Sequence, residues 1–255
     1  YEILRCLVGS EMCIRDRALV IGNGTMGATL YGGVKKDKIS FNDITLWTGE
    51  PESENSSPDA FNVIPEIRAL LDNEDYQGAD KAQYKVQGHY SENYQPLGTL
   101  TIEYLDDTAG ISDYHRWLDI GNATARTQYL KDGKLFTSDY FASAPDSVIV
   151  IRLKSENKEG IHALLSFDSP LPHSSQVADN EISVEGYAAY HSFPVYYKEE
   201  DKHRYDPERG IHFKTLVRVL SVDGSVKDRY SDSRIEIDGL SLIHISEPTR
   251  HLRIS

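Results

Sequence analysis

The chain has 255 residues and carries 40 acidic side chains against 27 lysines and arginines, which gives a formal net charge of −13 at pH 7. Such an acidic chain repels a phosphate backbone and an anionic membrane surface, so we expect no nucleic-acid partner and no membrane partner. The sequence shows no apolar run that approaches the ~20 residues of a spanning helix, while 39% hydrophobic residues are enough to form a packed core.

The sequences of the two terminal segments indicate that these segments do not belong to the native protein. SLIHISEPTR, at residues 241–250, can be written in codons whose reverse complement, read after skipping one base, translates as LVGSEMCIR, at residues 7–15. Unrelated protein segments are almost never encodable by opposite strands of one DNA element, and this element resembles a sequencing adapter translated in frame. We therefore expect residues 1–17 and 241–255 to be adapter-derived tails that add no stability, and residues 18–240 to be the native domain.

Strand-like runs dominate residues 18–240. In chain order they are ATLYGGV from Ala28, KISF from Lys38, GTLTIEYL from Gly98, ARTQYL from Ala125, KLFTSDYFA from Lys134, SVIVIRLK from Ser147, IHALLSF from Ile161, EISVEGYA from Glu181 and GIHFKTLVRVLSV from Gly210. Turn signals such as KDG from Lys131 and NKEG from Asn157 separate many of them. Short strands punctuated by Gly and Asp are typical of an antiparallel sandwich or barrel. The sequence therefore predicts one mainly β domain.

One insertion, at residues 62–84, carries helical periodicity. Its apolar residues recur at helical spacing in two halves, Val63, Ile67, Leu70 and Leu71 in the first and Tyr76, Ala79, Ala82 and Tyr84 in the second. This spacing predicts two short helices. The polar stretches at residues 50–60 and 196–210 predict surface loops.

The stretch GNGTMG, at residues 22–27, matches the G-x-G-x-x-G pattern of dinucleotide-binding proteins. It follows the strand-like ALVI, and Asp43 lies near where such proteins place the carboxylate that binds ribose. The pattern requires a helix to begin at its third glycine, but Gly32 and Gly33 interrupt the segment that would form it. A nucleotide-binding oxidoreductase is therefore an alternative that the patterning disfavours.

Six phrases follow one another along the domain: IGNGTMGATLYGGV from Ile21, ISFNDITLWTGEP from Ile39, YQPLGTLTIEY from Tyr94, YHRWLDIGNATA from Tyr114, YFASAPDSVIVIRL from Tyr140 and GIHFKTLVRVL from Gly210. This ordered set resembles the N-terminal domain of glycoside hydrolase family 95, whose members include α-L-fucosidases. The resemblance implies an antiparallel β-supersandwich with a short helical insertion, placed before a helical (α/α)₆ barrel that holds the catalytic site. Asn42-Asp43-Ile44 departs from the family's common Asn-Glu-Asp at this point.

The chain itself shows no helical-barrel pattern, so we interpret it as the N-terminal fragment of a bacterial enzyme that hydrolyses terminal α-L-fucosyl linkages. The resemblance implies that the acid and base lie in the missing barrel, so we assign no catalytic residue and expect the fragment to be inactive alone. It also implies two partners, the barrel domain of the same chain and a fucosylated glycan bound by the full-length enzyme. We expect the full-length protein to be periplasmic or secreted.

Sugars are held by aromatic rings flanked by hydrogen-bonding groups. This directs attention to Trp47 beside Asn42, and to His191 within AAYHSFPVYY, at residues 188–197. The alternative is that Trp47 and Trp117 are core aromatics. The histidines form neither H-x-x-x-H nor a compact Cys/His cluster, so we predict no metal and no cofactor. A stand-alone glycan-binding sandwich is the second function class that stays open.

Overall fold

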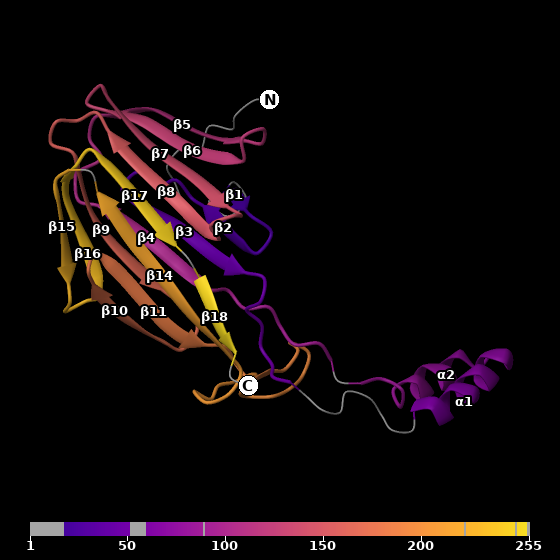
Figure 1. The fold of residues 1–255 in the computed structure, drawn as a ribbon. Helices are drawn as coiled ribbons and strands as arrows, with labels where there is room; N and C mark the ends of the chain where they lie inside the picture. The colour runs from indigo at the N-terminus through magenta and orange to yellow at the C-terminus, as the bar shows by residue number, and fades with distance from the viewer. Residues whose placement is uncertain (1–17, 52–59, 89, 222, 248, 254–255) are drawn as a thin grey trace.

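The computed structural model describes the chain except for residues 1–17, 52–59, 89, 222, 248 and 254–255. Two large antiparallel sheets face each other, and a pair of helices lies apart from them (Figure 1). The seven-stranded sheet contains, in spatial order, β1 (Leu19–Gly22), β2 (Met26–Leu30), β3 (Lys36–Asp43), β4 (Gly98–Tyr104), β9 (Ile161–Asp168), β16 (Arg234–Leu240) and β15 (Ser225–Arg229).

The second sheet has nine strands. Its spatial order is β10 (His173–Ala178), β11 (Glu181–Tyr187), β14 (Ile211–Ser221), β17 (Leu242–Glu247), β8 (Val148–Ser155), β7 (Lys134–Ser143), β6 (Thr124–Lys131) and β5 (Ile111–Asp119), while β18 (Thr249–Arg253) pairs with β14 beyond this path. A third, two-stranded ribbon joins β12 (His191–Ser192) to β13 (His203–Arg204). The predicted mainly β sandwich is confirmed.

Strict alternation along the strands places one shared core between the two sheets. In β4, the side chains of Leu100 and Ile102 point inward and are fully buried, while Thr99, Thr101 and Glu103 lie on the other face. The second sheet supplies equally buried side chains, including Ile149, Ile151 and Leu153 of β8, to the same cluster. Burying a side chain of this size stabilises the fold by about 1.5–3 kcal/mol, so the alternation alone brings the two sheets face to face.

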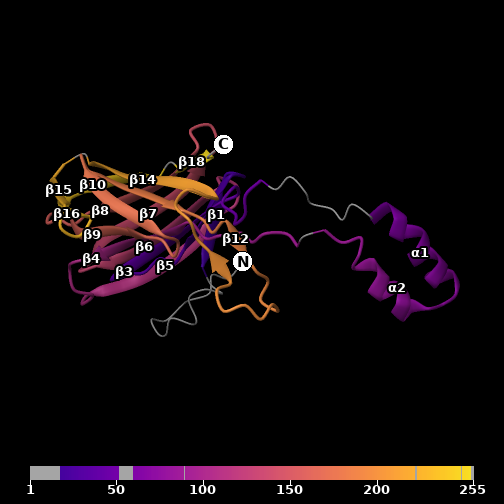
Figure 2. The ribbon, with the colours of Figure 1, turned by 90° about the horizontal axis from the view of Figure 1, so that it is seen from below.

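The helical insertion forms α1 (Ala60–Asp72) and α2 (Tyr76–Gln83), close to the predicted positions. Asp75 caps α2 by accepting a hydrogen bond from the Gly78 N–H at 2.9 Å. The two helices pack on each other and project away from the sandwich (Figures 1 and 2). Neither these helices nor any other helix in the described residues has the length and apolar character to cross a membrane.

The glycine-rich stretch at residues 22–27 is a hairpin turn between β1 and β2. The side-chain oxygen of Asn23 accepts hydrogen bonds from the N–H groups of Thr25 and Met26, at 3.1 and 2.8 Å. Gly24 has a φ of 97°, a conformation that glycine adopts without strain. A strand follows the turn where a phosphate-binding loop needs a helix, so the geometry does not support the nucleotide-binding alternative.

Asp37 of β3 lies inside the sandwich, where it is only 1% exposed. Its carboxylate accepts a hydrogen bond of 2.6 Å from the hydroxyl of Tyr140, on β7 of the opposite sheet, and one of 3.0 Å from the Gly33 N–H. Burial raises the pKa of Asp37 in spite of these donors. This buried acid therefore ties the two sheets together through a side-chain hydrogen bond.

The predicted C-terminal tail is partly built into the fold. Residues 242–247 form β17, which pairs with β14 on one side and β8 on the other. Ile243 and Ile245 are fully buried. The expectation that this segment adds no stability is corrected by this burial. From Ile243 to Ser246 apolar and polar residues alternate, so the segment can form an amphipathic strand whatever its origin. The adapter origin itself stays a prediction, and residues 1–17 lie outside the described residues.

The pH dependence of stability tests the buried carboxyl of Asp37. Its folded pKa is raised, so the folded state holds the proton between the unfolded and folded pKa values, and the stability linked to that proton is lost as pH rises through the folded pKa. We expect Asp37→Asn to become more stable relative to the unsubstituted chain as the pH rises above about 4, the ordinary carboxyl pKa, toward the raised folded pKa. Urea unfolding at several pH values measures this difference, and a difference that does not change with pH contradicts it.

Single substitutions in β17 test its contribution to stability. Ile245 is buried between the sheets, so we expect Ile245→Ala to lower the free energy of unfolding by about 2–5 kcal/mol. His244 points to the opposite face, so His244→Ala is the matched control and should change it by no more than about 0.5 kcal/mol. Equal, small effects of both substitutions in chemical denaturation would show that β17 is dispensable.

Candidate functional site

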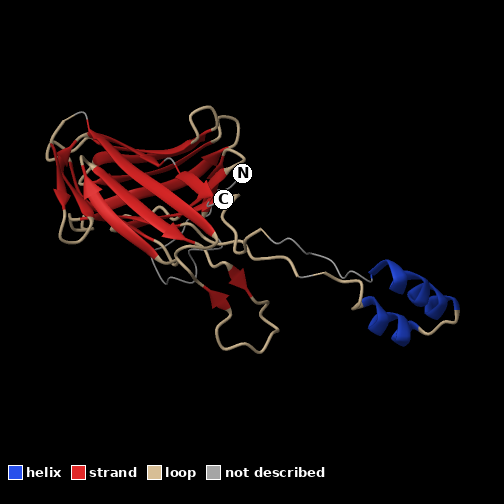
Figure 3. Ribbon diagram, turned by 60° about the horizontal axis from the view of Figure 1, so that its bottom comes forward, coloured by secondary structure: helices blue, strands red, loops and turns tan. Residues whose placement is uncertain are grey.

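Three connecting segments meet at one end of the sandwich beside the β12–β13 ribbon, which hangs below the large sheets in Figure 3. Backbone hydrogen bonds join Thr48 N–H to the Asn93 carbonyl at 2.8 Å and Gly49 N–H to the Ala189 carbonyl at 3.0 Å. We call residues 46–50, 90–95, 188–197 and 203–204 the loop cluster. It brings together parts of the chain that lie far apart in the sequence.

The carboxylate of Glu92 joins these segments. It accepts hydrogen bonds from the hydroxyl of Thr48, from the Ser192 N–H at 3.0 Å and from Nδ1 of His191 at 2.8 Å. The side chains of Glu92 and His191 are each 26% exposed, so the bonds are partly shielded from water. A carboxylate with three donors is held in one orientation, and Glu92 therefore positions the surrounding loops.

His191 lies between Glu92 and Tyr90. Because Nδ1 donates to the carboxylate, Nε2 of the neutral imidazole is left to accept, and the Tyr90 hydroxyl lies 3.1 Å from it. Burial, together with the nearby Tyr197 and Glu92, raises the pKa of the Tyr90 phenol. Tyr90 thus stays protonated at neutral pH and acts as a hydrogen-bond donor.

A second polar chain runs through Ser192, which is fully buried. The side-chain amide of Asn93 donates to the Ser192 hydroxyl at 2.7 Å, and that hydroxyl lies 2.8 Å from Nδ1 of His203. Beside it, Arg209 pairs with Glu50 and stacks over the ring of Tyr190, with its guanidinium carbon 3.8 Å from the ring centroid. The hydrogen bond from Arg209 lowers the pKa of Glu50.

The outer rim of the loop cluster is aromatic. The ring of Tyr90 packs against Phe193 and Tyr197 with centroid distances of 6.4 and 5.4 Å. Val195 and Tyr196 continue the rim into solvent, being 86% and 74% exposed. Aromatic rings with hydrogen-bonding groups beside them suit ligands that have one apolar face and a polar edge.

Two of the three residues predicted to bind substrate, Trp47 and His191, belong to the loop cluster. His191 belongs to the network of Glu92. Trp47 is 43% exposed, meets Tyr94 edge-on at 5.6 Å and donates from Nε1 to the Ile44 carbonyl at 2.9 Å. Asn42 lies instead within β3, on the face opposite the buried Phe41.

The alternative that both tryptophans are core aromatics is wrong, because Trp47 is exposed and Trp117 is only half-buried. Sequence reasoning also missed Glu92, Tyr90 and Asn93. These residues lie in a short polar connection before β4, and the sequence carries no signal that Glu92 meets His191 across ninety-nine positions. Only the exposed aromatic and polar composition of YSENY offers a hint.

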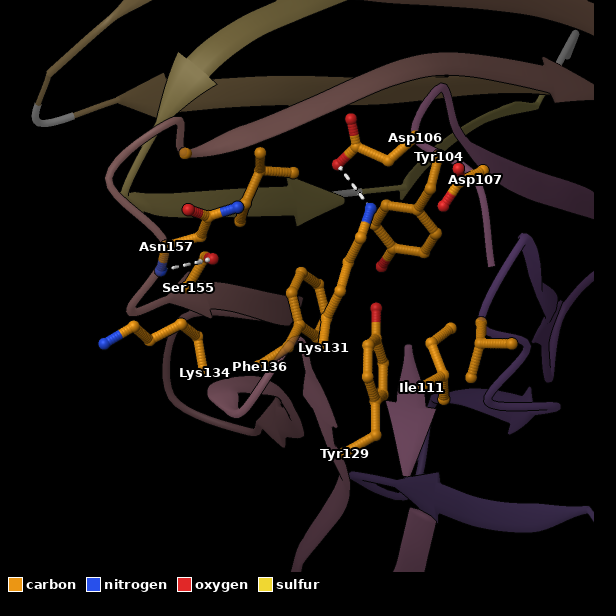
Figure 4. A pocket seen from close by; sticks show the side chains of 13 residues that line it. Tyr104, Asp106, Asp107, Ile111, Tyr129, Lys131, Lys134, Phe136, Ser155 and Asn157 are labelled. Atoms are coloured by element: carbon orange, nitrogen blue, oxygen red, sulfur yellow. Dashed lines mark hydrogen bonds and ion pairs between the residues drawn. The ribbon is translucent and has the colours of Figure 1, made fainter. Parts of the chain in front are cut away.

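A small hollow lies at the end of β4 that is opposite to the loop cluster (Figure 4). Tyr104, Tyr129 and Phe136 pack together there, and Lys131 pairs with Asp106 at 3.3 Å. The volume open to water is only about 30 Å³. That is room for ordered water but far below the several hundred Å³ of a ligand pocket, so we attribute to it a packing role. Among the described residues no His/Cys/Asp/Glu group is arranged to hold a metal ion.

Comparisons with known proteins point in one direction. The model of the glycosyl hydrolase family 65 N-terminal domain matches residues 10–247. "Alpha-L-fucosidase 2" of Arabidopsis thaliana is 32% identical over 217 residues, which are 82% of this chain and 26% of that protein. "Probable alpha-fucosidase A" of Aspergillus niger is 30% identical over 182 residues, 66% of this chain and 22% of that protein.

The protein of the same name from Aspergillus oryzae is 26% identical over 146 residues, which are 55% of this chain and 20% of that protein. The chain thus spans about a fifth to a quarter of the length of these curated relatives.

Removing the carboxylate of Glu92 tests its role in holding the loops. We expect Glu92→Ala to lower the free energy of unfolding by about 1–3 kcal/mol, because several buried donors lose their acceptor. The Ser192 N–H, which donates to Glu92, should exchange with solvent about tenfold faster or more. Glu199→Ala, in an exposed loop, is the matched control. Unchanged exchange at Ser192 in Glu92→Ala would contradict this role.

Proposed function

The chain belongs to the family of glycosyl hydrolase family 65 N-terminal domains, and from this membership we propose that it is the N-terminal β-sandwich of a glycoside hydrolase that removes terminal α-L-fucosyl residues. The observation that carries the proposal is the match to three relatives named as α-fucosidases, one of them across 82% of this chain. The finer assignment to glycoside hydrolase family 95 rests on the ordered phrases of the sequence.

We propose a non-catalytic role for this domain within the enzyme. Hydrolysis of a glycosidic bond needs an acid and a base on either side of the bond, with substrate held between them. Glu92, the central carboxylate of the loop cluster, is instead bonded to Thr48, Ser192 and His191. In this proposal an (α/α)₆ barrel of the same polypeptide supplies the acid and the base. This chain is then an N-terminal fragment of a bacterial enzyme that is periplasmic or secreted.

The loop cluster is the part of this domain that we expect to meet the substrate. Its polar network fixes His191, and its exposed rings, including those of Trp47 and Tyr196, offer apolar faces to a sugar. Loops positioned by a rigid scaffold commonly carry binding residues. In the full-length enzyme this end forms one edge of the cleft that holds a fucosylated glycan.

An activity assay tests both parts of the proposal. The 255-residue chain, incubated with an aryl α-L-fucoside and with a 2-linked fucosyl oligosaccharide, should show only the uncatalysed rate, because it lacks the acid and base that are each worth about 10²–10⁴ in rate. The longer polypeptide encoded around this segment should hydrolyse both. Hydrolysis by the 255-residue chain that disappears in Glu92→Gln would show that the catalytic groups lie here.

Substitutions in the longer polypeptide separate substrate binding from catalysis. Trp47→Ala or His191→Ala should raise KM about tenfold with kcat little changed, as expected when a contact made equally in ground and transition states is lost. Tyr230→Ala, at an exposed site in the turn between β15 and β16, serves as the control. Unchanged KM in both loop-cluster variants would remove these residues from the cleft.

A further inference from the structure

A shallow hollow lies on the outer face of the nine-stranded sheet, over β10, β11 and β14. Its volume is about 600 Å³, within the ~300–1,000 Å³ range of small-molecule sites. Six of its lining residues define its character: Pro172, Glu185, Tyr187, Pro207, His212 and Lys214. Neither the family assignment nor the loop cluster gives this hollow a role.

Strand register builds an aromatic platform at one side of the hollow. Tyr187 of β11 is the register partner of His212 on β14. Because the adjacent positions Gly186 and Phe213 are buried on the core face, the side chains of Tyr187 and His212 point outward. Their rings stack at 5.7 Å with an interplanar angle of 28°, and Tyr205 meets Tyr187 edge-on at 6.5 Å. The ring of Tyr187 is thereby held in one orientation.

The next outward pair places charges beside this platform. Glu185 and Lys214 are register partners, and Nζ of the lysine lies 2.6 Å from Oε1 of the glutamate. Their side chains are 60% and 39% exposed, so a ligand can reach both. An ammonium has three N–H donors and a carboxylate has a second oxygen, which leaves donors and acceptors for a ligand even while the ion pair is formed.

We propose that this hollow binds a neutral saccharide, with one pyranose face on Tyr187 and ring hydroxyls hydrogen-bonded to Glu185 and Lys214. A sugar hydroxyl both donates and accepts, which matches an adjacent carboxylate and ammonium. An anionic ligand is repelled by Glu185 and by the net charge of −13 on the chain. A cationic ligand is repelled by Lys214. The hollow adjoins the loop cluster, because Tyr187 directly precedes Ala188, but different side chains line it, and binding rather than turnover tests it.

Calorimetric titration of the complete 255-residue chain tests the site, with neutral 2′-fucosyllactose as the probe and anionic 3′-sialyllactose as the ligand control. We expect the neutral sugar to bind and the anionic one to bind at least about tenfold more weakly. Tyr187→Ala and Lys214→Met should each weaken binding of the neutral sugar about tenfold or more. Lys214→Met removes an exposed ion pair that is worth at most about 1 kcal/mol. This variant should therefore stay folded, and its sugar binding can be measured even if Tyr187→Ala fails to fold.

Tyr76→Ala and Tyr230→Ala, at exposed sites outside the hollow and the loop cluster, are the matched aromatic controls, and both should bind the neutral sugar as the unsubstituted chain does. Three results would overturn the site: no binding of 2′-fucosyllactose, binding that is lost in Trp47→Ala but kept in Tyr187→Ala, or equal binding of the two sugars. All of these titrations measure binding and not turnover. Loss of the saccharide site is therefore distinguishable from failure of the proposed fucosidase role.

Discussion

Alternation of apolar and polar residues along antiparallel strands is the constraint on which this structure depends. Each sheet has one apolar face that water must not reach, and the two sheets meet this requirement by facing each other across one shared core. A polar group inside that core needs a partner, since an unpaired one costs about 1–3 kcal/mol. Asp37 satisfies the rule across the core by accepting from Tyr140 of the opposite sheet, which also helps to set how the sheets lie against each other.

The two sheets fix the positions at which the segments of the loop cluster begin and end. Its segments leave the ends of β3 and β11 and enter β4, so their starting points are fixed before any side chain of the cluster makes a contact. Glu92 then needs only three short hydrogen bonds to hold segments that are about a hundred residues apart. In the described part of the chain the helical pair lies away from the sandwich, and α1 and α2 pack against each other (Figure 2).

The place of β17 shows how little information a strand needs to join a sheet. Between β8 and β14 the sheet offers backbone partners on both sides, and the interior accepts apolar side chains at every second position. LIHIS meets these requirements with Ile243 and Ile245 inward and His244 outward. A segment of any origin with this period satisfies the same backbone and packing rules, so occupancy of this position carries no information on where the segment came from.

By itself the sequence determined the mainly β class and the helical insertion, because periodicity and turn chemistry act over a few neighbouring residues. It also singled out Trp47 and His191 by residue type. Only the tertiary structure decided that His191 forms a hydrogen bond with Glu92, that Asn42 lies within strand β3, and that residues 242–247 belong to the sheet. These depend on which distant strands become neighbours, and that is settled by the packing of the whole core, on which a local pattern of side chains carries no information.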